Sequence, residues 1–209
     1  MENITEKDYD GHHCQYSQKE DHETMLTISR FAVFIIVSVV IYRISRPSLR
    51  SYRFHGFYRF FAWEAALALV LLNLDIRAYR PSSIHHMMAI LCLLLSGFLA
   101  IHGFYLLRRE GKLDDQRNDP TLLRVEKTTV LVTAGAYKFI RHPLYGSFLL
   151  FTWGSYLFIP SWQGGLLGIA ATLSVIVAAR VEEQENLRYF GAVYRDYMNR
   201  TKRFIPFIL

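Results

Sequence analysis

Residues 144–179 read LYGSFLLFTWGSYLFIPSWQGGLLGIAATLSVIVAA, and this stretch decides the fold of the chain. It holds two apolar runs, 144–159 and 164–179, of about 16 residues each, which approaches the ~20 apolar residues that a membrane-spanning helix needs. The connection between them is residues 160–163, which begins with a proline. The stretch therefore predicts two apolar helices that form a tight hairpin in a bilayer.

Three further apolar runs precede this hairpin, at 26–44, 57–74 and 84–107. Of the 209 residues in the chain, 52% are hydrophobic and 15% are aromatic. They form continuous runs, in place of the alternation that marks half-buried helices or strands, and such runs are typical of membrane spans. The sequence therefore predicts an all-α integral membrane protein with about five transmembrane helices.

Lysine and arginine are divided unevenly among the segments between these runs. The segments 43–59, 108–141 and 180–209 carry five, eight and six of them, whereas 1–25 and 75–83 carry two each. Because cytoplasmic loops are enriched in Lys and Arg, we expect an external N-terminus and a cytoplasmic C-terminus, in a bacterial inner membrane or a membrane of the endoplasmic reticulum type. The net charge of +6 belongs to these loops, so no nucleic acid partner is expected.

The first 24 residues contain seven acidic side chains and three histidines. This composition cannot bury a core and predicts a flexible polar tail. The tail lacks the basic start and short apolar core of a secretory signal, so the first apolar helix should direct membrane insertion. His12, His13, His22 and Cys14 could bind a metal, but they lack the paired spacings of a structural zinc site. We therefore expect no metal.

The segment LVTAGAYKFIRHPLYG at 131–146 joins charged, aromatic and helix-breaking residues at the entrance to the hairpin. Pro143 suits the first turn of a helix, where its missing N–H costs nothing, so Arg141 and His142 should stand at that helix's N-terminus. Helix N-termini favour anions, and Tyr137 and Tyr145 offer aromatic faces to a flat base or a cation. Two interpretations follow: a site for a carboxylate-bearing nucleotide, or residues that serve only the membrane interface.

A second segment, ARVEEQENLRYFGAVYRDYMNRTKRFIPFI at 179–208, follows the hairpin on the same side. Glu182 and Glu183 come directly after the apolar run, where they could bind hydroxyls or an ammonium group, or be solvated surface acids. Phe190, Tyr194 and Tyr197 recur at helical spacing. This spacing predicts a C-terminal amphipathic helix that lies on the cytoplasmic membrane surface.

Together the two segments contain LVTxGxYxxxRHPxY, a hairpin, a glutamate pair, FGxxYxxY and a terminal RFIP, over about 129–209. In this order and spacing they resemble the isoprenylcysteine carboxyl methyltransferase and phospholipid methyltransferase superfamily. The resemblance implies a pocket for S-adenosylmethionine between the hairpin and the C-terminal segment. It also implies a lipid or lipid-like acceptor that reaches this pocket through the bilayer.

The resemblance further implies which residues form the site. The implied cofactor contacts are Leu131, Val132, Tyr137, His142, Pro143, Leu144, Tyr145 and Glu182. The residues implied for catalysis are Arg141, His142, Glu182 and Glu183, with Arg203, Tyr194 and Tyr197 as supports. In this interpretation Arg141 and His142 anchor the cofactor's carboxylate end, and Glu182 binds its hydroxyls or ammonium group.

The identity of the methyl acceptor stays open. Superfamily members that act on isoprenylcysteine carry an arginine four residues before the cofactor glutamate, whereas this chain has Ala178 there. That departure argues against prenylcysteine. Phospholipid amines, carboxylates, lipid-linked thiols and small thiols remain, and Glu64 and His102 are candidate bases for an acceptor that must lose a proton.

These observations divide the chain into three regions: the tail 1–24, three helices and a linker over 25–128 on the acceptor side, and a cofactor-binding core over 129–209. Two other functions compete with methyl transfer. A membrane sterol-type reductase would bind NADPH in a similar C-terminal half, but this chain lacks its longer multi-helix region. A non-catalytic lipid-binding protein would be expected to have lost the motif residues. No obligatory protein partner is inferred.

Overall fold

The computed structural model describes residues 6–74, 83–112, 121–123 and 126–205. In this part of the chain the regular structure is helical, as the apolar runs predicted. The helices are α1 (Glu6–Ser45), α2 (His55–Leu72), α3 (Ile84–Glu110), α4 (Pro143–Phe158), α5 (Trp162–Phe190) and α6 (Ala192–Arg200), with 3₁₀ turns η1 (Ser48–Arg50) and η4 (Gly135–Lys138). The chain falls into two units, Met1–Val40 and Ile41–Leu209.

The first unit consists of helix α1 up to Val40. Residues 6–24, which we expected to form a flexible tail, are helical here. The chain has no proline before Pro47, and Glu, Lys and Gln favour helix, so a helix nucleated in the apolar run extends backward through them. The side chains of residues 1–22, including His12, His13, His22 and Cys14, lie outside the described residues.

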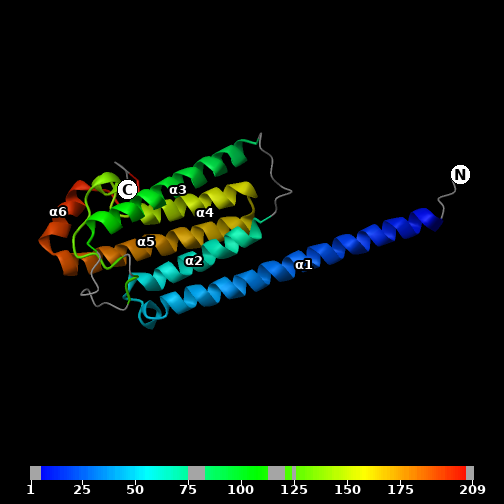
Figure 1. Ribbon diagram of the computed structural model, residues 1–209, viewed down its shortest axis with the longest axis horizontal. Coiled ribbons are helices and arrows are strands. Elements are labelled where there is room, and N and C mark those ends of the chain that lie inside the picture. Colours follow the sequence, from blue (N-terminus) through cyan, green and yellow to red (C-terminus); the bar gives the residue numbers. More distant parts are fainter. Residues whose placement is uncertain (1–5, 75–82, 113–120, 124–125, 206–209) are drawn as a thin grey trace. The chain divides into compact units, whose positions relative to one another are not determined.

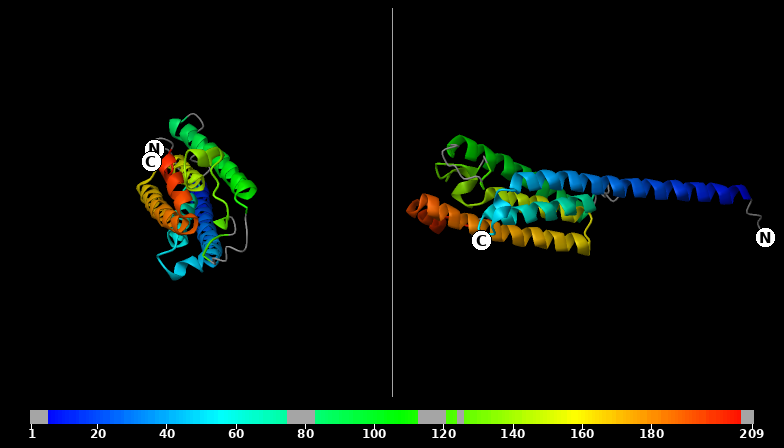
Figure 2. Two further views of the ribbon diagram at one scale, coloured as in Figure 1. Left: turned by 90° about the vertical axis from the view of Figure 1, so that its left-hand side faces the viewer. Right: turned by 90° about the horizontal axis from the view of Figure 1, so that it is seen from below.

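In the second unit, helices α2, α3, α4 and α5 lie side by side (Figures 1 and 2). The most extensive packing joins α3 to α4 and α2 to α5. Small residues such as Ala62, Ala66, Ala171 and Ala178 are buried between the helices. Small residues let helix backbones approach closely, which is how membrane helices gain packing energy without a hydrophobic driving force.

Three of the described helical segments are long and apolar enough to cross a membrane: Glu23–Ser45, Ile84–Glu110 and Trp162–Phe190. Their mean hydropathies are 2.2, 2.2 and 1.8. Helices α2 and α4 coincide with the predicted apolar runs 57–74 and 144–159. With 18 and 16 residues, they are shorter than these three segments. The helix positions were thus predicted from apolarity.

The ends of α4 and α5 follow local sequence signals. Helix α4 begins at Pro143, which confirms the predicted first turn and places His142 at its N-terminal boundary. Helix α5 begins after Ser161, whose hydroxyl accepts a hydrogen bond from the N–H of Gly164 at 3.1 Å, satisfying one of the free N–H groups of the first turn. It continues to Phe190, so Glu182 and Glu183 lie within a helix.

Gly191 ends α5 with φ of +60°, a conformation that glycine adopts without strain, and the short helix α6 follows. We predicted that this segment forms an amphipathic helix that lies on the cytoplasmic membrane surface. In the structure Tyr194 and Tyr197 are buried within the protein, at 2% and 3% exposure. The buried face of α6 therefore packs against the protein, where the Tyr197 hydroxyl finds a backbone hydrogen-bond partner, as described below.

Candidate functional site

The site lies at the end of the bundle where α2 starts, α3 ends and α6 lies (Figure 1). Here the residues after α6 run beside the segment that leads into α4. The N–H of Arg141 donates to the carbonyl of Lys202 at 2.8 Å, and the N–H of His142 donates to that of Arg203 at 3.1 Å. These bonds bring two segments about 60 residues apart into register and fix Arg141 and His142 against the C-terminal segment.

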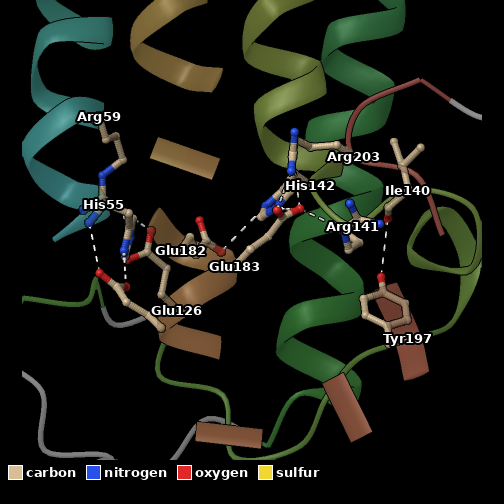
Figure 3. Close-up of polar contacts among 11 residues, drawn as sticks. His55, Arg59, Glu126, Ile140, Arg141, His142, Glu182, Glu183, Tyr197 and Arg203 are labelled. Atoms are coloured by element: carbon tan, nitrogen blue, oxygen red, sulfur yellow. Dashed lines mark hydrogen bonds and ion pairs between the residues drawn. The ribbon is translucent and has the colours of Figure 1, made fainter. Parts of the chain in front are cut away.

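A buried ion-pair network holds this junction together (Figure 3). The Glu183 carboxylate, 2% exposed, accepts from Arg141 Nε at 2.8 Å and from Arg203 Nη2 at 2.6 Å. His142 Nε2 lies 3.4 Å from the same carboxylate. Arg141 also donates to the carbonyl of Thr201. Because charge-assisted hydrogen bonds are the strong ones, Glu183 is the anchor between α5, the start of α4 and the C-terminal segment.

A second contact locks α6 to the same place. The Tyr197 hydroxyl donates to the carbonyl of Tyr137 at 2.7 Å (Figure 3 shows its neighbouring contact with Ile140). Tyr137 itself lies in η4, whose first residue, Gly135, has φ of +54°. A Cβ at that position would lie 2.5 Å from His102 Nε2. Glycine is therefore required there both for the backbone conformation and for the close approach to α3.

These elements enclose a cavity of about 120 Å³. All eight residues implied as cofactor contacts line it: Leu131, Val132, Tyr137, His142, Pro143, Leu144, Tyr145 and Glu182. Arg141, Phe190, Tyr194 and Tyr197 line it as well, together with four residues that the sequence did not single out: Leu107, Glu126, Thr128 and Asn186. The structure thus brings the motif residues of two separate segments around one space.

Glu182 and Glu183 have different surroundings although they are adjacent. The Glu182 side chain lines the cavity and is 24% exposed, and its Oε1 atom lies 3.9 Å from His142 Nδ1. Its negative charge reaches the tyrosines: burial and then the Glu182 carboxylate raise the pKa of Tyr137 and of Tyr194. The cavity is therefore an aromatic space with a carboxylate on its wall, which favours a cationic ligand.

Of the four predicted catalytic residues, three line the smaller cavity and one does not. Glu182 and His142 line the cavity, and Arg141 lines it while its guanidinium is engaged by Glu183 and by backbone carbonyls. Glu183 is not among the residues that line the cavity; its carboxylate faces the two arginines. Its position indicates that it orients Arg141 and His142.

A larger cavity of about 350 Å³ adjoins the first. The two share three lining residues, Glu126, Leu144 and Tyr145. The larger one is lined mainly by apolar and aromatic side chains from α2, α3 and α4, such as Trp63, Phe104 and Phe148. Among the described residues that line these two cavities, neither Glu64 nor His102 occurs; His102 stacks on Phe98 with an interplanar angle of 3°.

At the boundary of the two cavities lies a charged cluster that sequence reasoning missed: His55, Arg59, Glu126 and Glu185 (Figure 3 labels the first three). His55 Nδ1 lies 2.6 Å from Glu185 Oε2, and His55 Nε2 lies 3.3 Å from Glu126 Oε2. Arg59 forms an ion pair with Glu126. His55 and Arg59 are 1% and 3% exposed. One feature of the sequence indicated this cluster: His55 and Arg59 are basic residues spaced i and i+4, which places them on one face of a helix.

The charges in this cluster hold one another ionised. Burial alone would lower the pKa of His55, but the Glu126 and Glu185 carboxylates outweigh it and raise the pKa to about 10. Burial alone would raise the pKa of Glu126, but Arg59 and His55 outweigh it and lower the pKa to about 2. At neutral pH a protonated His55 therefore faces an ionised Glu126.

The fold and the site define a class of protein: a helical membrane protein with two adjoining cavities at one end of its bundle. Within that class, a model of the phospholipid methyltransferase family matches residues 84–196. The chain belongs to this family. The match spans α3, the site segment, α4, α5 and the start of α6, so it contains most of the lining of the smaller cavity.

Curated relatives are similar over part of the chain. Methanethiol S-methyltransferase 2 of Bradyrhizobium diazoefficiens is 38% identical over 72 residues, which are 34% of this chain and 26% of that protein. Methanethiol S-methyltransferase of a Pseudomonas species is 30% identical over 115 residues, 54% of this chain and 40% of that protein. The matches thus span about a quarter to two fifths of the relatives' lengths. No solved structure gave a significant match.

Proposed function

We propose that this chain is an S-adenosylmethionine-dependent methyltransferase that acts on an apolar, lipid-like acceptor at the membrane. One observation carries the proposal: the eight residues implied as cofactor contacts, drawn from segments about 40 residues apart, line one cavity. Membership of the phospholipid methyltransferase family and the names of the relatives, which are methanethiol S-methyltransferases, support methyl transfer as the reaction.

The chemistry of the lining fits the cofactor. S-adenosylmethionine carries a sulfonium and an ammonium group, and the cavity offers them the Glu182 carboxylate and the faces of Tyr137 and Tyr194. The apolar side chains of Leu131 and Val132 suit the flat adenine. The cavity of about 120 Å³ is below the ~300 Å³ at the lower end for small-molecule sites, so binding requires its walls to move apart or the ligand to extend past Tyr145.

When bound, the cofactor supplies a methyl group to which the acceptor's electron pair forms a bond, while the carbon–sulfur bond breaks and its pair stays on sulfur. The residues of this chain position the acceptor and exclude water, which supply most of the rate in such displacements. Glu183 holds Arg141 and His142 against the cavity wall. Leu144 and Tyr145, shared by both cavities, lie where acceptor and cofactor would meet.

The larger cavity is the acceptor chamber in this proposal. Its volume of about 350 Å³ and its mainly apolar lining suit a molecule with a hydrocarbon body, and its walls come from helices that would contact lipid. The relatives are named for a small thiol, and the acceptor of this chain could share that reactive group on a larger apolar body.

The same proposal includes five membrane crossings, with α2 and α4 as the two shorter ones and α4 and α5 as a hairpin. The Lys- and Arg-rich segments 43–59, 126–141 and 180–203 lie at one end of the second unit (Figure 1). By the positive-inside rule that end is cytoplasmic, which puts the site at the cytoplasmic face of the membrane and α6 near its surface.

Calorimetric titration of the detergent-purified protein tests the proposal. S-adenosylhomocysteine and NADPH are titrated into the wild type, His142→Ala and Glu182→Ala, with Asp196→Ala, an exposed acid on α6, as the matched control. We expect binding of S-adenosylhomocysteine that both cavity variants lose and the control keeps. Binding of NADPH alone would move the function to a reductase. A folded protein that binds neither ligand would exclude both enzymes.

A further inference from the structure

The observation that carries this inference is a pair of arginines at the end of α3 whose guanidinium groups lie over aromatic rings of the same helix. Arg108 Cζ lies 5.3 Å from the centroid of the Phe104 ring, and Arg109 Cζ lies 5.8 Å from that of Tyr105. Arg109 Nη1 also donates to the Tyr105 hydroxyl at 2.9 Å. Each ring comes one helical turn before its arginine, so both cations point back along α3.

Both cations keep hydrogen-bond donors for a ligand. Arg108 and Arg109 are exposed, and in the described part of the chain neither forms an ion pair with a carboxylate. A guanidinium has five N–H donors in its own plane, and a ring beside that plane leaves these donors free. Arginine binds a phosphate through two parallel N–H bonds. The end of α3 therefore presents two adjacent cations that suit a phosphate group.

An exposed apolar stripe on α3 leads to these arginines. Its members, each more than half exposed, are Leu94, Phe98, Ile101 and Tyr105. They are spaced three or four residues apart, which places them on one face of the helix. From Leu94 to Arg108 the helix rises about 21 Å, whereas one leaflet of the hydrocarbon core is about 15 Å thick. The stripe is thus long enough to hold an acyl chain through its leaflet, with the headgroup at the arginines.

We propose that Arg108 and Arg109 bind the phosphate of an anionic phospholipid whose acyl chain lies along this stripe. The inference rests on the membrane crossing of α3 that is part of the proposed function, and not on methyl transfer. Two adjacent cations favour a headgroup with a net negative charge, because they repel the ammonium group of a zwitterionic one. Since Phe104 lines the acceptor chamber and is 40% exposed, the bound lipid borders the outer edge of the chamber.

Native mass spectrometry of the detergent-purified full chain tests the site. Phosphatidylglycerol and phosphatidylcholine with the same acyl chains are titrated separately, and the dissociation constant of the first bound lipid is measured. The variants are Arg108→Gln, Arg109→Gln and the two combined. The matched control combines Arg188→Gln with Arg195→Gln, which removes two exposed arginines from α5 and α6 and changes the net charge equally.

We expect the wild type to bind phosphatidylglycerol more tightly than phosphatidylcholine. An arginine near an anionic headgroup contributes about fivefold in affinity, so phosphatidylglycerol binding should weaken about fivefold in each single variant and roughly 25-fold in the combined one. Binding of phosphatidylcholine should change less, because its net charge is zero. The control should bind both lipids as the wild type does.

Equal binding of the two lipids by the wild type, or unchanged phosphatidylglycerol binding in the combined variant, would overturn the inference. An equal loss in the control would do so as well, because the effect would then come from net charge and not from this site. Displacement of phosphatidylglycerol by inorganic phosphate would assign the arginines to a free anion. A wild-type dimer that excludes the lipid would assign the stripe to a second copy, and either result would overturn the lipid site.

Binding of S-adenosylhomocysteine separates this inference from the proposed function. The combined variant should bind it as the wild type does, because neither Arg108 nor Arg109 lines either cavity. If the wild type binds S-adenosylhomocysteine but does not prefer phosphatidylglycerol, the lipid site is wrong and methyl transfer stands. If it prefers phosphatidylglycerol but does not bind S-adenosylhomocysteine, the lipid site stands and the proposed reaction is wrong.

Discussion

Neutralising Glu183 should destabilise the protein, whereas neutralising the adjacent Glu182 should not. The Glu183 side chain is 3% exposed. It is bound by the side chains of Arg141, which is 9% exposed, and Arg203, which is 23% exposed. Removing one partner of a buried ion pair costs about 3–5 kcal/mol. In Glu183→Gln one acceptor oxygen remains and Arg203 keeps some contact with solvent, so we expect the lower end, about 3 kcal/mol.

The assay is thermal unfolding of the detergent-purified variants. For a chain of about 200 residues, 1 kcal/mol corresponds to roughly 2–4 °C, so Glu183→Gln should lower the unfolding midpoint by about 6–12 °C. Glu182→Gln is the matched control, since it makes the same change one residue away. Its midpoint should stay within about 2 °C of the wild type, while its binding of S-adenosylhomocysteine is lost.

The opposite result would refute this reasoning. If Glu182→Gln lowered the midpoint and Glu183→Gln did not, the assignment of Glu183 as the buried anchor would be wrong. If Glu183→Gln kept its stability but lost ligand binding, Glu183 would act on the ligand directly, as the motif resemblance first implied, and not through Arg141.

Three further predictions concern stability and use the same unfolding assay. Tyr197→Phe removes the buried hydrogen bond to the Tyr137 carbonyl at 2.7 Å and should cost about 0.5–1.5 kcal/mol; an unchanged midpoint would mean that water replaces it. Gly135→Ala should cost more than the roughly 1–3 kcal/mol of a strained backbone conformation alone, because its φ is +54° and a Cβ there would also lie 2.5 Å from His102 Nε2; a smaller fall in the midpoint would mean that α3 moves to admit the methyl group. The pKa of His55 is raised from 6.5 to about 10. Its contribution to the free energy of unfolding is therefore complete below pH 6.5 and is lost as the pH rises through 10. The unfolding midpoint of the wild type should fall over this window, and that of His55→Gln should fall less.

Much of the fold was predictable because it depends on local properties. The five apolar runs correspond to α1–α5, and Pro143 was correctly placed in the first turn of α4. The N-terminal residues were predicted as a flexible tail, but a helix extends through 6–24. Composition showed that this segment cannot form a core; it could not show that the neighbouring helix would continue into it.

The candidate site was predictable where the motif carries it. The eight implied cofactor contacts line one cavity, and their role stays a prediction. His55, Arg59, Glu126 and Glu185 were not predicted as a cluster, because His55 and Glu185 are 130 residues apart and lie outside the motif segments. The burial of Tyr194 and Tyr197 was also missed, since an amphipathic face is the same in sequence whether it covers protein or lipid.

The sequence by itself determined that this chain is helical, that long apolar segments suit it to a membrane, and that its C-terminal half carries the motif of a methyltransferase family. Run length, charge asymmetry and motif spacing are read along the chain and need no partner. Only the tertiary structure decided which glutamate of the pair lines the cavity. Adjacent helix residues point about 100° apart, so the backbone pairing of Arg141 and His142 with residues 202–203 turns Glu183 toward the arginines and leaves Glu182 at the cavity.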